Sequence, residues 1–143
     1  MESIGLIMNT NTLICALNSQ YIHSSLAPWC LMAGINAYGT GKISASVLES
    51  TVNERVEITL NKIIQPAPKY IGFSCYIWNL SYAEEIIEDI KKILPKVTIW
   101  AGGPEVSFDA ADVLGRVPSL KGVICGEGEE IFFELAKIYR DAA

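Results

Sequence analysis

Short apolar runs alternate with amphipathic stretches along almost the whole chain. Five runs read as strands, at residues 12–17, 42–48, 70–76, 97–101 and 121–125. The first of them is apolar at nearly every position, which is typical of a strand buried on both faces. The intervening stretches predict helices at 26–37, 53–64, 81–94 and 131–139, and a short helix or turn at 108–117. Strands and helices that alternate over short links predict a parallel sheet with right-handed crossovers.

We expect a flavodoxin-like (Rossmann-like) α/β fold, a doubly wound five-stranded parallel sheet in the order 2-1-3-4-5. In that order the ligand crevice opens at the carboxyl ends of the first and third strands. The least regular loops of the sequence follow predicted strands. They are residues 18–25, 74–79, 101–107 and 126–129.

The helix at 81–94 has the clearest pattern in the chain. Ser81 and Glu84 have the spacing of a capping box. Its inner face is expected to hold Ala83, Ile86, Ile87, Ile90, Ile93 and Leu94. Asn53 is the expected cap of the preceding helix. We interpret residues 1–11 as a leader or an added extension, and residues 12–143 as one domain.

Composition and charge argue against two classes of binding partner. The 143 residues are 50% hydrophobic and carry a net charge of −5, which argues against a grip on nucleic acid or on an anionic membrane. No Asp, Glu, Lys or Arg lies between Glu2 and Lys42, but polar residues and Pro28 break this stretch well short of the ~20 apolar residues of a span. The four cysteines lie far apart, so we expect free core thiols and a cytoplasmic protein.

Two glycine-rich loops are the main candidates for ligand contact. Gly102 and Gly103 follow the fourth strand, where missing Cβ atoms either make a turn or let a ligand approach the backbone. Gly126-Glu127-Gly128-Glu129 follows the fifth strand, and its acids also suit a helix N-terminus. Neither loop matches G-x-G-x-x-G or GxxxxGK[ST], so a dinucleotide or a nucleoside triphosphate is not expected.

The other loops hold single polar or aromatic candidates. Ser74 either donates to a ligand or bonds its own backbone. Trp78 either lines a pocket or belongs to the core. His23 is the only histidine, and no Cys or carboxylate stands near it in sequence, so neither a triad nor a metal cluster is indicated. No catalytic residue is predicted.

Taken together, these loops resemble a known family. The residues that carry the resemblance are 18–26, 71–74, the GGPEVS run at 102–107 and the GEGE run at 126–129. This combination resembles the N-terminal cobalamin (vitamin B12)-binding domain of cobalamin-dependent radical S-adenosylmethionine proteins. Anaerobic Mg-protoporphyrin IX monomethyl ester cyclases and radical methyltransferases belong to that group. The resemblance covers about residues 12–140.

The resemblance implies base-off cobalamin whose corrin lies over the strand ends. Its nucleotide tail would enter a groove beside the first, third and fourth strands, with room given by Gly102 and Gly103, and Ser74 would contact the tail base. The cofactor-binding residues implied are Asn18, Ser19, Gln20, Tyr21, His23, Ser74, Tyr76, Trp78, Gly102, Gly103, Pro104, Glu105, Gly126 and Glu127.

The chain departs from the family pattern in two places. Classical cobalamin domains carry D-x-H-x-x-G after the first strand, and Gln20 stands here where that histidine ligates cobalt. His23, three residues later, is the candidate cobalt ligand. The CxxxCxxC motif that binds a 4Fe-4S cluster is absent. S-adenosylmethionine and the cluster would therefore belong to a downstream radical domain, and we expect an excised amino-terminal domain that is not catalytic alone.

Two hypotheses of different class follow. In the first, the chain is the cobalamin-binding module of a radical enzyme that performs methyl transfer or a related modification of a tetrapyrrole or small molecule. In the second, it is a flavodoxin-like regulatory or interaction module that does not bind cobalamin. A phosphoacceptor receiver is disfavoured, because Ser74-Cys75-Tyr76 stands where that class needs an aspartate.

Overall fold

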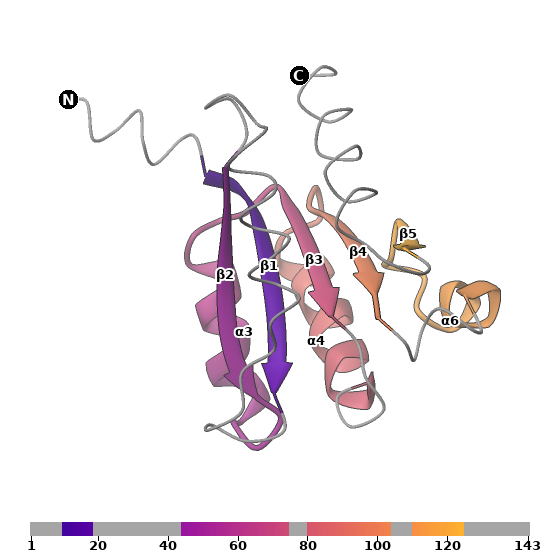
Figure 1. Cartoon of the computed structure of the whole chain (residues 1–143), viewed down its shortest axis with the longest axis horizontal. Helices are drawn as coiled ribbons and strands as arrows, with labels where there is room; N and C mark the ends of the chain where they lie inside the picture. The colour runs from indigo at the N-terminus through magenta and orange to yellow at the C-terminus, as the bar shows by residue number, and fades with distance from the viewer. Residues whose placement is uncertain (1–9, 19–43, 75–79, 104–109, 125–143) are drawn as a thin grey trace.

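The computed structural model describes residues 10–18, 44–74, 80–103 and 110–124. Five strands form one parallel sheet in the order β2-β1-β3-β4-β5, as the sequence predicts. The strands are β1 (Thr10–Asn18), β2 (Ser44–Thr51), β3 (Tyr70–Ser74), β4 (Thr98–Gly102) and β5 (Gly122–Ile124). In Figure 1 all five run in the same direction, so their carboxyl ends lie at one edge of the sheet. The expected helices at 26–37 and 131–139 lie outside the described residues.

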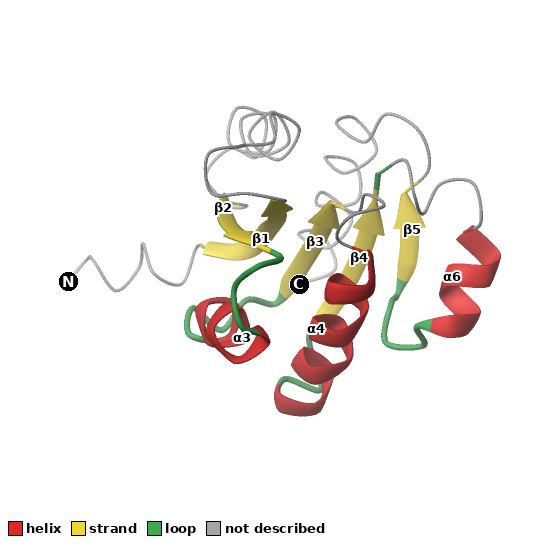
Figure 2. Ribbon diagram, turned by 90° about the horizontal axis from the view of Figure 1, so that it is seen from below, coloured by secondary structure: helices red, strands yellow, loops and turns green. Residues whose placement is uncertain are grey.

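Three described helices follow strands: α3 (Val56–Ile64), α4 (Leu80–Ile93) and α6 (Ala110–Arg116). Helices α3 and α4 cover the same face of the sheet, and α6 lies beside β5 (Figure 2). The core between sheet and helices includes Cys15, Ile71 and Ile99 from the strands and Ile63, Ile86 and Ile90 from the helices, all no more than 1% exposed. Burial of these side chains supplies the main drive for this packing.

Helix α4 confirms most of the predicted inner face and corrects its two ends. Ala83, Ile86, Ile87 and Ile90 are buried as expected. The capping box is wrong, because α4 begins at Leu80 and Ser81 therefore lies inside its first turn. Ile93 is also wrong as a core residue, since it ends the helix and is 51% exposed. Leu94, the last residue of the predicted face, packs against the core as expected.

The expected cap of α3 is also wrong. The helix begins at Val56 with Arg55 at the N-cap position, and no side chain caps it. Asn53 belongs instead to a turn at the end of β2, where its backbone N–H donates to Thr51 Oγ1 over 2.9 Å. The N–H of Glu54 donates to the carbonyl of Thr51 in the same turn. The strand ends at Thr51, three residues later than expected, and this displaced the start of the helix.

Candidate functional site

The carboxyl edge of the sheet holds the point where the strand order reverses. The chain crosses from β2, on one side of β1, to β3, on the other side. Ligands of doubly wound sheets bind in the crevice outside this point. Ala16, Ser74, Gly102 and Ile124 are register partners there on four neighbouring strands. Three of these four side chains are small or absent, so the edge leaves room over the middle of the sheet.

On the face opposite α3 and α4, the neighbouring strands β3 and β4 carry residues that are only partly buried. Along β3 and β4, fully buried positions alternate with partly exposed ones. The partly exposed positions form what we call the open strip: Tyr70, Gly72 and Ser74 on β3, with Thr98, Trp100 and Gly102 on β4. On β1, by contrast, Thr12, Ile14 and Ala16 are at most 3% exposed on that same face. Central strands of a parallel sheet are normally buried on both faces, so the strip is a candidate ligand surface.

The two glycines at the end of β4 differ in what they require. A Cβ built on Gly102 would lie 3.5 Å from the Ile124 carbonyl oxygen and 3.7 Å from its Cβ, which are ordinary contacts. The backbone therefore accepts a side chain at Gly102, and that side chain would stand on the open strip. Gly103 has φ 115°, a conformation that strains any residue with a Cβ. Gly102 thus provides space, whereas Gly103 provides a turn.

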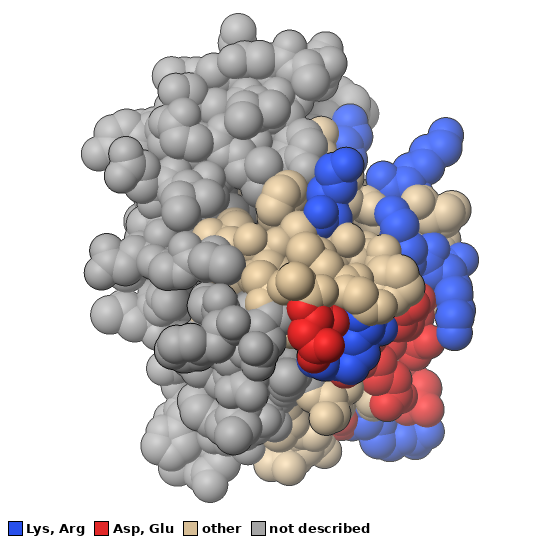
Figure 3. All heavy atoms as spheres, turned by 90° about the vertical axis from the view of Figure 1, so that its right-hand side faces the viewer, with Lys and Arg blue, Asp and Glu red and all other residues tan. Residues whose placement is uncertain are grey.

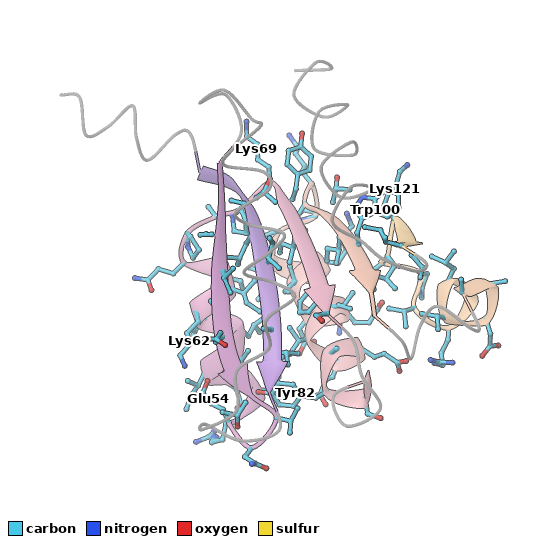
Figure 4. The ribbon with its side chains drawn as sticks, in the orientation of Figure 1. Glu54, Lys62, Lys69, Tyr82, Trp100 and Lys121 are labelled. Atoms are coloured by element: carbon cyan, nitrogen blue, oxygen red, sulfur yellow. The ribbon has the colours of Figure 1, made fainter. Side chains whose placement is uncertain are left out.

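A polar network holds the carboxyl end of β2 to two helices. Ser50 Oγ donates to Glu54 Oε1 over 2.6 Å, and Lys62 Nζ on α3 donates to both carboxylate oxygens over 2.9 and 3.1 Å. Tyr82 on α4 donates to the Glu54 carbonyl over 2.8 Å. The buried Thr59 hydroxyl lies within 3.0 Å of Ser50, Glu54 and Tyr82 oxygens. Figure 4 shows Glu54, Lys62 and Tyr82 at the end of the sheet where the strands finish. The network therefore fixes the edge that bears the candidate site.

Acid is expected to weaken this network. The hydrogen bonds from Lys62 and Ser50 hold the pKa of Glu54 below its ordinary value of about 4.5. A carboxylate with a lowered pKa stabilises the fold above its unfolded pKa, and that stability is lost as the pH falls through the folded one. Urea unfolding at a series of pH values should show a steeper loss below about pH 4.5 in the wild type than in Glu54→Gln. Identical pH profiles for the two proteins would contradict a role for Glu54.

The opposite edge of the sheet carries exposed lysines. Lys69, Lys96 and Lys121 stand just before β3, β4 and β5. Figure 3 shows Lys and Arg side chains gathered toward this end of the described surface, with acidic side chains beside them. Each lysine lies three to five residues after the last residue of the preceding helix, α3, α4 or α6. These lysines are remote from the carboxyl ends of the strands.

Among the predicted site residues, the structure brings Ser74, Gly102 and Gly103 together at the carboxyl edge. Asn18 ends β1 at that edge, paired with Thr51. The other predicted site residues lie outside the described part of the chain: Ser19, Gln20, Tyr21, His23, Tyr76, Trp78, Pro104, Glu105, Gly126 and Glu127. Gly72 and Trp100, which are not among the predicted site residues, lie on the same strip. Their alternation with Ile71, Phe73, Ile99 and Ala101 is the signal that places them on the strip.

Three further features bear on the chemistry of the described residues. Cys15 is a free, fully buried thiol whose pKa burial raises, so it is unsuited to act as a nucleophile. Within the residues that the structure describes, no cluster of His, Cys, Asp and Glu could hold a metal ion. The same residues include no helix long and apolar enough to cross a bilayer. The edge therefore offers a surface for a bound group, without reactive side chains of its own in the described part.

Known proteins agree with this geometry. A family model for the B12 binding domain matches residues 13–136. The 2-(S-pantetheinyl)-carbapenam-3-carboxylate methyltransferase of Streptantibioticus cattleyicolor is 34% identical over 68 residues, which are 48% of this chain and 10% of that protein. The chain thus spans a small part of this curated relative.

Two solved structures share the fold. The radical S-adenosylmethionine methyltransferase TsrM of Kitasatospora setae, solved with cobalamin and a [4Fe-4S] cluster, matches with a TM-score of 0.67 and 19% identity over 93% of this chain and 27% of its own. A CheY-like protein (TadZ) of Pseudomonas aeruginosa matches with a TM-score of 0.62 and 15% identity over 93% of this chain and 100% of its own. Solved structures with 15–19% sequence identity show that the fold is shared, but they do not identify the ligand of this chain.

The family match covers most of the chain, so the class of protein is clear. The chain belongs to the B12-binding domain family. Its cofactor is cobalamin, as the sequence analysis predicts. The alternative of a regulatory module without cobalamin loses its support, because the family model matches despite Gln20 at the position of the usual histidine.

The described residues leave space for a side-chain-sized group at the carboxyl edge. Gly102 leaves free the space that a side chain would fill, and Gly72 adds a second bare position on the strip. The strip runs from the carboxyl edge to the middle of the sheet, and its positions alternate with the buried core positions of β3 and β4.

Proposed function

We propose that this chain holds cobalamin for a radical S-adenosylmethionine enzyme that performs methyl transfer or a related modification of a tetrapyrrole or small molecule. The observation that carries the proposal is the open strip, which begins at the switch point of a B12-binding domain. When bound, cobalamin supplies a cobalt centre that can carry a methyl group. The relative from S. cattleyicolor is named a methyltransferase, which supports this class of reaction.

In this proposal the residues of the chain bind and orient the cofactor. The corrin lies over the strand ends, against the loops of Asn18, Ser19, Gln20 and Tyr21 and of Gly126 and Glu127. Its tail follows the open strip, where the Ser74 hydroxyl contacts the tail base and Gly102 leaves room. Tyr76, Trp78, Pro104 and Glu105 are further cofactor-binding residues in this proposal, and His23 is the candidate cobalt ligand.

The partner in this proposal is a catalytic domain that binds S-adenosylmethionine and a 4Fe-4S cluster. The exposed upper face of the corrin would be presented to that domain, and no residue of this chain acts as a catalyst. We also propose a cytoplasmic location, supported by the free thiol of Cys15, which suits a reducing compartment. Neither nucleic acid nor membrane enters the proposal.

The experiment is cofactor retention. The purified chain is mixed with hydroxocobalamin and desalted, and corrin absorbance is measured in the protein fraction. We expect about one corrin per chain to be retained, because a single switch point offers a single site. A protein fraction without corrin absorbance, from a chain that unfolds cooperatively in urea, would overturn the proposal.

A further inference from the structure

The hydroxyl of Tyr82 joins helix α4 to the end of β2 and to α3. It donates to the main-chain carbonyl of Glu54 over 2.8 Å and lies 2.8 Å from the hydroxyl of Thr59 on α3. Thr59 in turn lies 2.9 Å from the hydroxyl of Ser50 on β2. Figure 4 shows Tyr82 and Glu54 at the same end of the sheet. One phenol on α4 thus reaches β2 through a chain of hydroxyls.

The end of β2 lies directly beside the end of β1. Ser50 and Thr51 are the register partners of Leu17 and Asn18. Asn18 is the last residue of β1, and it is one of the predicted cofactor-binding residues. Within the described sheet β2 is an outer strand that pairs with β1. A shift of the end of β2 would therefore pass to the end of β1 through the hydrogen bonds of this parallel pair.

The hydroxyls of this chain are hard to replace, because each carries a single proton. Thr59 is 0% exposed and Ser50 is 5% exposed, so water has little access to either. Among the described residues, no buried side-chain nitrogen or oxygen lacks a hydrogen-bond partner. Loss of one hydroxyl would leave its neighbours short of a partner, and they would have to move to find another. The network therefore holds the end of β2 in one position.

We propose that Tyr82 is a positioning residue for cobalamin, which sets the carboxyl end of β1 through Thr59 and Ser50. The proposal rests on the proposed function, in which Asn18 and the residues after it contact the corrin. Tyr82 itself does not touch the cofactor. Its hydroxyl keeps the end of β2, and with it Asn18, in the position that meets the corrin, so less of the site has to be ordered when the cofactor binds.

Tyr82→Phe removes the hydroxyl and keeps the ring. We expect the affinity for hydroxocobalamin, measured by titration, to fall about 5-fold to 10-fold, which corresponds to one lost hydrogen bond. Without cofactor, the backbone amide resonance of Asn18 should shift. The matched control is Ile90→Val, which trims a side chain that is 0% exposed near the other end of α4. It also lowers stability, but it should bind hydroxocobalamin like the wild type and leave the Asn18 resonance in place.

A pair of substitutions at Thr59 tests the same chain of hydroxyls at its buried centre. Thr59→Val keeps the shape of the side chain and removes the hydroxyl, so it should lose affinity for hydroxocobalamin as Tyr82→Phe does. Thr59→Ser keeps the hydroxyl and should keep most of the wild-type affinity. The double variant Tyr82→Phe/Thr59→Val should bind little more weakly than either single variant, because both hydroxyls act through the same chain.

The outcomes separate the two proposals. Wild-type affinity in Tyr82→Phe, or equal losses in Tyr82→Phe and Ile90→Val, would overturn the role of Tyr82 and leave the proposed function standing. Equal losses in Thr59→Ser and Thr59→Val would do the same, because they would assign the effect to packing. A wild-type chain that retains no hydroxocobalamin would overturn the proposed function, and the role of Tyr82 with it. Cooperative urea unfolding shows which variants are folded, and if Tyr82→Phe is not, the Thr59 pair decides the question.

Discussion

Gly102→Trp is expected to lose cobalamin while the domain stays folded. The backbone at Gly102 accepts a Cβ, whose nearest neighbours would be Ile124 atoms at 3.5 and 3.7 Å. The indole would then stand on the open strip, in the space assigned to the cofactor tail. Overpacking of this kind costs about 1–3 kcal/mol, so we expect an affinity loss on the order of 100-fold, measured by titration with hydroxocobalamin.

Gly115→Trp is the matched control, because a Cβ on Gly115 in α6 meets nothing within 4 Å. It introduces the same residue on the surface and should bind hydroxocobalamin like the wild type. Gly103 is unsuitable for this experiment, since its φ of 115° means that any side chain strains the backbone as well as the site. Wild-type affinity in Gly102→Trp would place the tail elsewhere.

Ile86→Ala is expected to cause the largest loss of stability. Ile86 is 0% exposed and lies in the core between α4 and the sheet. Removing a buried isoleucine side chain leaves a cavity and costs about 2–5 kcal/mol of unfolding free energy. Urea denaturation followed by circular dichroism measures this change.

Ile93→Ala removes the same atoms from the same helix at a position 51% exposed. We expect this control to stay within about 0.5 kcal/mol of the wild type, as for most surface substitutions. Similar losses in the two variants would mean that α4 is buried on a different face from the one described.

Short apolar runs were sufficient to predict the sheet, because each strand carries its own burial pattern. The continuous apolar run at 12–17 predicted a strand buried on both faces, and Leu13 to Leu17 are at most 4% exposed. Topology followed from the short crossovers, and the strand order is confirmed.

Helix ends were harder to predict, because several consecutive residues can each either cap the helix or form a turn before it. Asn53 and Ser81 both have cap-forming side chains, yet Asn53 lies in a turn and Ser81 inside a helix. Glu84, predicted as the partner of Ser81, instead accepts hydrogen bonds from Arg116 Nη2 and Nε over 2.6 and 2.9 Å. The partner of Glu84 lies 32 residues along the chain, so a local pattern does not contain it, whereas Asn53 was decided by a turn with Thr51 that competes with the cap.

Some residues of the candidate site could likewise be predicted from the sequence, and others could not. Gly102, Gly103 and Ser74 were predictable because residue type and strand end together indicate a ligand loop. Trp100 was not, because a tryptophan within a strand reads as core until register places Gly72 and Gly122 on either side of it. The different roles of Gly102 and Gly103 likewise could not be predicted, because they depend on the backbone φ angle of Gly103, which the sequence does not give.

The open strip has a consequence for the amount of folded protein in a cell. An occupant that needs the strip in its native shape binds only the folded chain, so it draws the folding equilibrium toward that state. A ligand present at 100 times its dissociation constant adds about 2.7 kcal/mol to the unfolding free energy. Starvation for the occupant would then expose more of this chain to proteolysis, and its abundance would follow the vitamin supply.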